Sequence, residues 1–312
     1  MEQSRGVVWA AMLAALALLV SVLMRAVMGV LARLLSAELS VLQQVSLRCL
    51  LGALLILLIC HGRLRLAAFW HLPRTAQWLL VQRAVALFVV GMSLGTEAFI
   101  QGNYTTTTLV LALPTTALVS RWYFGERLST RVMMLVALSF VGVLVFVAGN
   151  GQTLLLGWPF WCALAAAVAM SWGMLAARKT VVTVPADAAN AMPPPALSNL
   201  EATFWMLLIA ALVCGVLALP VAWWEGKMPR PGLATWLTAA VAGLASIAFV
   251  WTSDYAIPRL RGVVVNNILA LQPIAGAMIG WLLYGDVLTP LQWLGGGLVV
   301  LSVWLIARVR AG

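Results

Sequence analysis

Long apolar runs recur along almost the entire chain, and they restrict its fold more than any other feature. Each run holds about 17 to 25 residues, the length of helix that crosses roughly 30 Å of hydrocarbon. A chain that is 63% hydrophobic and 9% charged cannot enclose that much apolar surface in a water-soluble core, because soluble domains carry about 25% charged residues. We therefore expect lipid, rather than water, around most of the surface.

The runs are continuously apolar and rich in Leu and Ala, whereas the strands of a membrane barrel alternate with a period of two. The expected fold is all-α, a polytopic membrane protein with ten transmembrane helices. The expected spans are residues 7–24, 41–60, 76–97, 104–122, 132–148, 155–177, 201–222, 233–253, 262–284 and 290–307. The first run lacks the small-residue cleavage site of a removable signal peptide, so we expect it in the mature protein.

The net charge of +10 is explained by membrane topology rather than by nucleic-acid binding. With ten spans and both termini in the cytoplasm, thirteen basic residues fall on the inner side and three on the outer side. The inner set is Arg5, Arg63, Arg65, Arg74, Arg121, Arg127, Arg131, Arg178, Lys179, Arg259, Arg261, Arg308 and Arg310. The outer set is Arg33, Lys227 and Arg230, and Arg25, Arg48 and Arg83 lie inside or near spans. This asymmetry is the one that the positive-inside rule predicts.

One unusual helix is present twice. The sequence "TTLVLALP", residues 107–114, matches "NNILALQP", residues 266–273, in its apolar positions and its proline. After one inserted residue, "GERLST" at 125–130 aligns with "GDVLTP" at 285–290. The shared order of proline, glycine and acid is too specific for a chance likeness between two Leu-rich helices.

The match extends backward more weakly, from Gly6 in the first half and Gly157 in the second. We therefore interpret the chain as two copies of five spans, residues 1–150 and 151–312. An odd number of spans per copy inserts the second copy upside down relative to the first. Many secondary transporters are inverted repeats of this kind, with a substrate site between the copies near the middle of the bilayer.

Both copies of the motif, "YTTTTLVLALPTTALVSRWYFGERLST" and "VVVNNILALQPIAGAMIGWLLYGDVLTP", resemble the paired EamA domains of the drug/metabolite transporter superfamily. The second span, "LQQVSLRCLLGALLILL", resembles the early Arg-containing helix of that family, with Arg48 in the matching position. Asp286 stands where the family usually has Glu. The resemblance implies ten helices, cytoplasmic termini, and export or exchange of small organic solutes such as amino acids, without fixing the substrate.

Ionisable side chains inside spans are expensive in lipid and are the first candidates for a solute path. Arg83 and Glu97 lie 14 residues apart on the third span, which places them about 40° apart around an ideal helix and roughly 21 Å apart along it. Gln101 continues the same face. This pattern indicates either a polar path for a solute or an Arg83 side chain that extends to the inner headgroups.

Two further ionisable residues leave two interpretations open. Arg48 has no partner near it in the sequence, and a structural role fits it as well as a substrate contact. Asp254, near the inner end of the eighth span, is expected to form an ion pair with Arg259 or Arg261, with proton coupling as the alternative.

Hydroxyl and amide groups can bind a polar solute without the energetic penalty of a buried charge. Under the inverted repeat, Thr107 and Thr108 near the outer end of the fourth span align with Asn266 and Asn267 near the inner end of the ninth, with Gln272 at the centre. We predict that these five side chains contact the solute. The alternative is hydrogen bonding between helices, worth about 0.6 kcal/mol on average.

Pro114 and Pro273 each remove one backbone hydrogen bond at mid-membrane, which predicts a joint for gating, although such prolines are also tolerated without a role. Glu126 and Asp286 follow glycines at interfacial turns and are expected to be structural caps. Most of the 15 tryptophans are expected at the membrane interfaces. Trp172, inside the sixth span, is instead expected to line the cavity.

The sequence "GMSLG", Gly91–Gly95, matches the nucleophile elbow of serine hydrolases. An intramembrane hydrolase using Ser93 would need a base, and the two histidines, His61 and His71, fall in a loop. The same residues form a G-x-x-x-G face for helix packing, which is the interpretation we favour.

The sequence therefore predicts an inner-membrane permease that exports or exchanges a small organic metabolite by alternating access. Uptake of a nucleoside-like or vitamin-like compound is the alternative within transport, because direction is not encoded. The expected partners are a small-molecule substrate and the lipid bilayer, with no nucleic acid, and a homodimer is left open. We expect no enzymatic activity, cofactor or metal.

Overall fold

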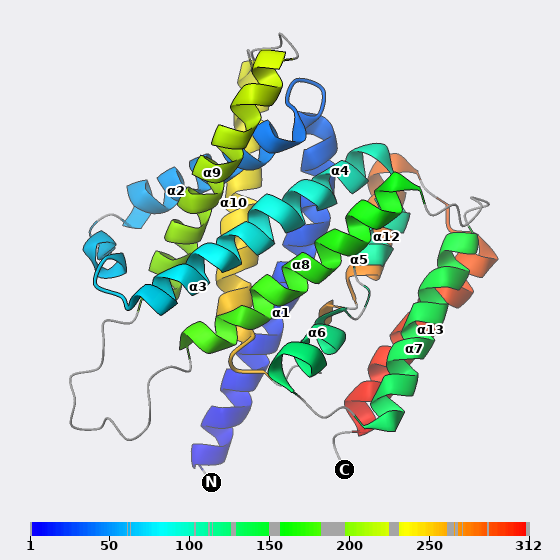
Figure 1. Cartoon of the computed structure of the whole chain (residues 1–312). Helices are drawn as coiled ribbons and strands as arrows, with labels where there is room; N and C mark the ends of the chain where they lie inside the picture. The colour runs from blue at the N-terminus through cyan, green and yellow to red at the C-terminus, as the bar shows by residue number, and fades with distance from the viewer. Residues whose placement is uncertain are drawn as a thin grey trace.

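The computed structural model describes the backbone of residues 2–60, 62, 64–102, 104–111, 113, 115–125, 129–149, 157–181, 197–224, 231–260, 265, 268–269, 271–285 and 287–309. Every regular element within these ranges is a helix (Figure 1). This all-helical structure agrees with the expected all-α membrane protein.

The first half of the chain contains α1 (Glu2–Leu35), α2 (Val41–Cys60), the short η2 (Leu66–Phe69), α3 (Arg74–Ala84), the π-helix η3 (Val85–Met92), α4 (Ser93–Gln101), α5 (Tyr104–Leu111), α6 (Thr115–Phe124) and α7 (Thr130–Ala148). The second half contains α8 (Trp158–Val181), α9 (Asn199–Trp224), α10 (Leu233–Ala256), α12 (Gln272–Tyr284) and α13 (Pro290–Val309). In Figure 1, α1 begins and α13 ends at the same end of the molecule.

Six helical segments among the described residues are long and apolar enough to cross a membrane. They are Met12–Leu35, Val41–Cys60, Arg74–Gln101, Trp158–Ala177, Asn199–Pro220 and Leu233–Ala256. Shorter apolar helices occupy three more of the expected spans, at Thr130–Phe146, Ile274–Leu283 and Pro290–Ser302. The total of ten transmembrane helices thus stays a prediction.

The expectation of one continuous helix over residues 104–122 is wrong. The chain there forms two helices, α5 and α6, which are separated between Leu111 and Thr115. Residues 262–284 are also not one continuous helix, because α12 begins at Gln272 after a turn at Leu271, although Val265, Ile268 and Leu269 before it are helical. Pro273 therefore lies in the first turn of α12, where a proline removes no intrahelical hydrogen bond. The predicted loosening of mid-helix by Pro273 does not apply.

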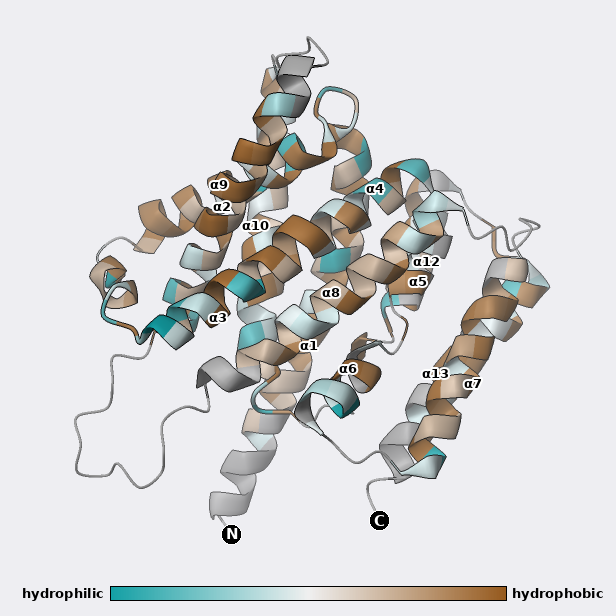
Figure 2. Cartoon of the chain, in the orientation of Figure 1, coloured by the Kyte–Doolittle hydropathy of each residue, from teal (hydrophilic) through white to brown (hydrophobic). Residues whose placement is uncertain are grey.

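The outer surface of this protein differs from that of a soluble domain. Large apolar side chains point outward, with Trp122 88%, Val287 84% and Leu233 77% exposed. Arg48 and Arg83, in contrast, are 2% and 1% exposed. Figure 2 shows hydrophobic residues along most of the described helices. Such a surface is stable in hydrocarbon and would aggregate in water, so lipid is the natural solvent of these helices.

Helices from the two halves of the chain pack in pairs. α7 lies along α13, α2 along α9, and α5 against α12, whereas α1 packs along α10 and α8 packs along η3 and α4. We match the first to fifth spans of one half, in order, with the first to fifth spans of the other. Each of the first three contacts then joins two matched spans. Exchanging the halves converts the contact of α1 with α10 into the contact of α8 with η3 and α4, and the reverse. The packing pattern is therefore unchanged when the halves are interchanged.

The repeated motif has the same local structure in both copies. Gly125 and Gly285 follow the ends of α6 and α12 and have φ of +65° and +67°, a left-handed conformation that terminates helices and favours glycine. The next helix then starts with a hydroxyl cap. Ser129 Oγ accepts the Val132 N–H at 3.3 Å, and Thr289 Oγ1 accepts the Gln292 N–H at the same distance.

Candidate functional site

A small pocket whose wall includes four polar side chains, called the polar pocket below, lies where helices of both halves meet. Its wall includes Arg25 of α1, Arg48 of α2, Thr96 of α4 and Gln272 of α12, together with residues of α5, α8 and α10. The pocket volume is about 30 Å³, which accommodates about two water molecules. A metabolite can therefore occupy this place only after the surrounding helices move apart.

Arg25 lies in the interior of α1 and is 8% exposed. One guanidinium nitrogen, Nη2, donates to Met170 Sδ at 3.3 Å, and the guanidinium carbon lies 5.7 Å from the centre of the Phe249 ring. A thioether sulfur is a weak acceptor, and a ring face attracts a cation by only about 0.5 to 2 kcal/mol. These contacts leave the positive charge of Arg25 largely uncompensated.

Arg48 and Gln272 bring further unsatisfied polar atoms to the same pocket. Arg48 is 2% exposed, and its Nη2 donates to Thr96 Oγ1 at 3.2 Å. Its Nε, and both the nitrogen and oxygen of the Gln272 amide, have no hydrogen-bond partner among the described residues. Buried polar groups are normally paired, so unpaired groups that converge on one pocket indicate a binding site for a polar ligand.

Two glycines fix the position of Arg48. A Cβ atom at Gly243 of α10 would lie 2.9 Å from both the Arg48 carbonyl oxygen and the Gly52 nitrogen of α2. The backbones of α2 and α10 therefore approach one another directly at this level, as small residues allow in membrane helices. The close crossing places the base of the Arg48 side chain deep in the bundle.

A second charged cluster joins α3, α8 and α10. Arg83 Nη2 lies 2.6 Å from Asp254 Oδ1, and Arg83 Nε donates to the Gly173 carbonyl oxygen at 3.1 Å. The expected ion pair of Asp254 with Arg259 is wrong, because Arg259 Nη1 donates to the Tyr255 carbonyl instead. The other expected partner, Arg261, lies outside the described residues. The alternative that Arg83 extends to the headgroups is also wrong, because the side chain is 1% exposed.

The predicted polar face shared by Arg83 and Glu97 is not present in the expected form. Glu97 accepts a hydrogen bond from Gln101 within α4, whereas Arg83 bonds to α8 and α10. Between them lies η3, Val85–Met92, and a π-helical turn advances fewer degrees per residue than an α-helical turn. The 40° separation calculated for an ideal helix therefore does not hold.

Three other predicted site residues lie outside the polar pocket. Thr107 is 3% exposed, and its hydroxyl donates to the Ala98 carbonyl at 3.0 Å. Thr108 is fully buried where α5 meets Gly276 of α12. Trp172 makes an edge-on contact with the Tyr123 ring at 5.9 Å. Each of these residues packs helices together in this conformation, and their contact with a solute stays a prediction.

Several predicted positions cannot be placed. Pro114, Asn266 and Asn267 lie outside the described residues, and for Pro273 only the backbone is described. Among the residues predicted to contact the solute that the structure places with their side chains, Gln272 lines the polar pocket. Arg48, for which a substrate contact was one of two open interpretations, lines it as well.

The glycines around Ser93 pack helices together. A Cβ atom at Gly91 would lie 2.6 Å from Met170 Cγ, and one at Gly95 would meet Met170 Cε and the Ala166 Cβ at ordinary contact distance. Ser93 is 9% exposed. This geometry fits the helix-packing interpretation of "GMSLG".

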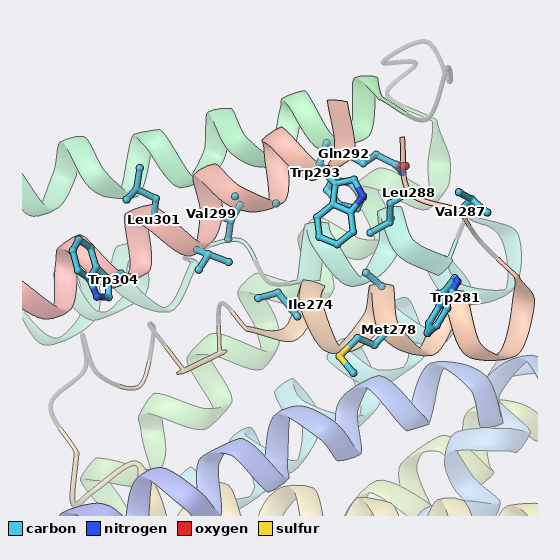
Figure 3. Close-up of a pocket in the computed structure, with 15 residues that line it drawn as sticks. Ile274, Met278, Trp281, Val287, Leu288, Gln292, Trp293, Val299, Leu301 and Trp304 are labelled. Carbon is cyan, nitrogen blue, oxygen red and sulfur yellow. The ribbon is translucent and has the colours of Figure 1, made fainter. Parts of the chain in front are cut away.

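A much larger cavity lies elsewhere and has a different character. Figure 3 shows it between α12 and α13, with Ile274, Met278 and Trp281 on one side and Trp293 and Leu301 on the other. Its volume is about 970 Å³, and its lining is almost entirely apolar. Such a groove can accommodate hydrocarbon, but it lacks the converging polar groups that orient a polar solute.

Sequence reasoning missed Arg25 as a site residue. The first span was predicted to end at residue 24, which placed Arg25 at the edge of the membrane. α1 continues to Leu35, so the guanidinium lies well inside the helix. The sequence contains a signal for this position. Arg25 is a single charge with apolar residues on both sides, which indicates an ionisable group inside a span.

Comparison with known proteins agrees with this architecture. Residues 157–308 match the EamA-like transporter family. This match spans nearly all of the second half of the chain, which is therefore similar to that family. The EamA match covers α8 to α12 and nearly all of α13, and therefore includes Met170, Phe249 and Gln272 of the polar pocket. The resemblance expected from the repeated motif is confirmed, and EamA proteins are membrane transporters of the drug/metabolite transporter superfamily rather than enzymes.

No curated protein matches the chain. A solved crystal structure of another protein matches with a TM-score of 0.69 and 16% sequence identity, over 95% of this chain and 98% of that one. At this identity the similarity demonstrates a common fold and carries no information about the solute. The common fold therefore extends over nearly the whole chain.

Proposed function

We propose that the chain is a secondary transporter of the inner membrane that exports or exchanges a small organic metabolite by alternating access. The observation that carries this proposal is the polar pocket, which is too small for a metabolite in this conformation and is walled by both halves of the chain. A solute that reaches it from either side must separate helices of one half from helices of the other. That movement is the central step of alternating access.

The halves act as two inverted repeats, residues 1–150 and 151–312. The packing of helices, which is unchanged when the halves are interchanged, supports this arrangement. The matching left-handed glycines, Gly125 and Gly285, support it independently, since each copy ends one helix and caps the next in the same way. With this symmetry, any contact that closes one mouth has a counterpart that closes the other.

The gates lie at the interrupted helices. α5 and α6 are separate, and α12 begins at Gln272 beside the pocket. Transporters commonly build their sites from interrupted helices, since free backbone groups and a joint occur at the same place. Pro273 then acts by preventing α12 from extending backward across the pocket, rather than by weakening the middle of a helix.

Both termini are cytoplasmic in this proposal. The first and last helices have their terminal ends at one end of the molecule (Figure 1), and the basic residues divide thirteen to three between the two sides. Single cysteines introduced at His71 and Gly226, in a variant without Cys49, Cys60, Cys162 and Cys214, test the orientation. In intact cells an impermeant maleimide should label position 226 and leave 71 unlabelled, and the reverse result contradicts the orientation.

Transport itself is tested in two steps. A thermal-shift screen of metabolites on the detergent-purified chain identifies a ligand, since a ligand at 100 times its dissociation constant adds about 2.7 kcal/mol to the free energy of unfolding. Proteoliposomes loaded with that ligand should then take up its labelled form without ATP. Gln272→Ala should weaken binding about two- to tenfold, whereas Gln77→Ala, an amide outside the pocket, should have no effect. Absence of counterflow for every stabilising metabolite contradicts the proposal.

A further inference from the structure

The positive charge inside the polar pocket is not balanced by any carboxylate among the described side chains. The described part of the chain has four carboxylates whose side chains are placed, and each of them has partners elsewhere. Glu38 accepts the Gly232 N–H, Glu97 accepts from Gln101, Glu201 pairs with Arg65, and Asp254 pairs with Arg83. The guanidinium groups of Arg25 and Arg48 form no ion pair among these residues.

Two buried guanidinium groups in one pocket destabilise the protein unless a negative charge compensates them. A guanidinium remains protonated at every physiological pH, so neither group can lose its charge as a buried Lys or His does. In the same bundle, the buried charge of Arg83 is compensated by the Asp254 carboxylate at 2.6 Å. Arg25 and Arg48 have no such carboxylate among the described side chains, which indicates that the solute supplies their negative partner.

We propose that the transported solute is an amphipathic organic anion, whose carboxylate or phosphate group binds between Arg25 and Arg48. This inference rests on the proposed transport function and specifies its substrate class. The unpaired Arg48 Nε and the Gln272 amide supply further hydrogen-bonding groups for the anionic head. Guanidinium groups suit this role because their planar arrangement of donors matches the oxygens of carboxylates and phosphates.

The rest of the pocket wall selects an apolar body for this anion. Met28, Met92 and Met170 contribute flexible thioether side chains, and Phe99 and Phe249 contribute aromatic rings. Methionine adapts to ligands of different shape, which suits a pocket that must expand from about 30 Å³. An inorganic anion would leave this apolar wall without a partner.

A series of ligands with one body and different charges tests the substrate class. The probes are phenylacetate, its neutral amide phenylacetamide, the cation phenethylammonium and phenyl phosphate, each titrated into the detergent-purified full chain. The wild type should bind the better of the two anions at least tenfold more tightly than the amide or the cation. Tighter binding of phenylacetate identifies carboxylates as the preferred class, and tighter binding of phenyl phosphate identifies phosphate esters.

Variants of the two arginines connect the preference to the pocket. Arg25→Gln and Arg48→Gln should each weaken anion binding by about 10- to 150-fold, the effect of losing a hydrogen bond to a charged group. Binding of phenylacetamide should change less than twofold. Arg48→Lys keeps the charge and loses the paired N–H groups, so its affinity should lie between wild type and Arg48→Gln. Arg259→Gln, an exposed arginine outside the pocket, is the matched control.

The wild-type series decides the question even if a variant does not fold. Equal affinity for the anions, the amide and the cation overturns the inference, as does unchanged anion binding in folded Arg25→Gln and Arg48→Gln. Counterflow of a cationic or neutral metabolite without anion binding overturns the substrate class and leaves the transport function standing. Selective anion binding without counterflow supports the anion site and contradicts the transport function.

Discussion

Replacing Asp254 with Asn removes the negative partner of Arg83 while it preserves the size of the side chain. The two charged groups are 2.6 Å apart, and both residues are at most 5% exposed. The variant therefore leaves a guanidinium buried without its counter-charge. Loss of one partner from a buried ion pair typically lowers the free energy of unfolding by about 3 to 5 kcal/mol.

Arg83→Gln, the other single variant of this pair, should lower the free energy of unfolding less than Asp254→Asn does. Arg83→Gln leaves a buried carboxyl, which can take up a proton, whereas the guanidinium left by Asp254→Asn cannot lose one. The double variant removes both charges, and replacement of an entire buried pair is often nearly neutral. We expect it to recover most of the loss, with an interaction energy of about 3 kcal/mol or more in the double-mutant cycle.

Unfolding in mixed detergent and SDS micelles, followed by tryptophan fluorescence, measures all four proteins. Arg65→Gln is the matched control, because its partner interaction with Glu201 spans 3.4 Å and its side chain is 67% exposed. The Glu201 carboxylate is 1% exposed, but it also accepts the backbone N–H groups of Arg65 and Ser198, both of which remain in Arg65→Gln. Loss of the exposed Arg65 side chain should therefore cost at most about 1 kcal/mol. Two results would refute the reasoning: losses below about 1 kcal/mol in both single variants, or a double variant whose loss equals the sum of the singles.

Three further variants test other parts of the structure. A Cβ atom at Gly276 would lie 2.5 Å from Thr108 Oγ1, so Gly276→Ala should lower the free energy of unfolding by about 1 to 3 kcal/mol; Gly297→Ala, with no atom within 4 Å, should not lower it. Pro273→Ala should slow solute exchange without changing affinity, because α12 could then extend backward; exchange at the wild-type rate would contradict the gating role. A backbone N–H at the start of α10 holds the pKa of Glu38 below its ordinary value of 4.5. The stabilising effect of the Glu38 carboxylate should therefore be complete above pH 4.5 and decline as the pH falls through the lowered pKa. The pH profile of the free energy of unfolding of Glu38→Gln should lack this decline.

Hydropathy predicted where most helices lie because each transmembrane helix must satisfy its backbone hydrogen bonds within itself. That requirement is local, so residues 41–60 and 233–253 were predicted within a few residues of α2 and α10. The separation of α5 from α6 was not predicted, since the residues around it are as apolar as those on either side. A helix can be interrupted where neighbouring helices supply hydrogen-bond partners for the freed backbone groups. Hydropathy contains no information about these partners.

The candidate site was predicted only in part, for a related reason. Gln272 was placed at the centre from the repeat, and it lines the pocket. The partnership of Arg83 with Asp254 spans 171 residues of sequence and depends on which helices pack against which. Arg25 was missed because a composition-based boundary cut the first helix short. Residue type and span therefore indicate which groups are buried, whereas their partners require the three-dimensional arrangement.

If the chain transports the anion proposed above, the charges of Arg25 and Arg48 also determine what force drives transport. Because a guanidinium keeps its proton at physiological pH, a proton gradient would not act on this pair, and a bound anion would be moved by voltage. An inside-negative membrane potential contributes about 2.3 kcal/mol per charge for each 100 mV, which corresponds to roughly a fifty-fold concentration ratio in favour of the outside. A cell would thus expel a monovalent anion through this protein without a coupling ion, whereas accumulation of the same anion would require at least one cation to enter with it.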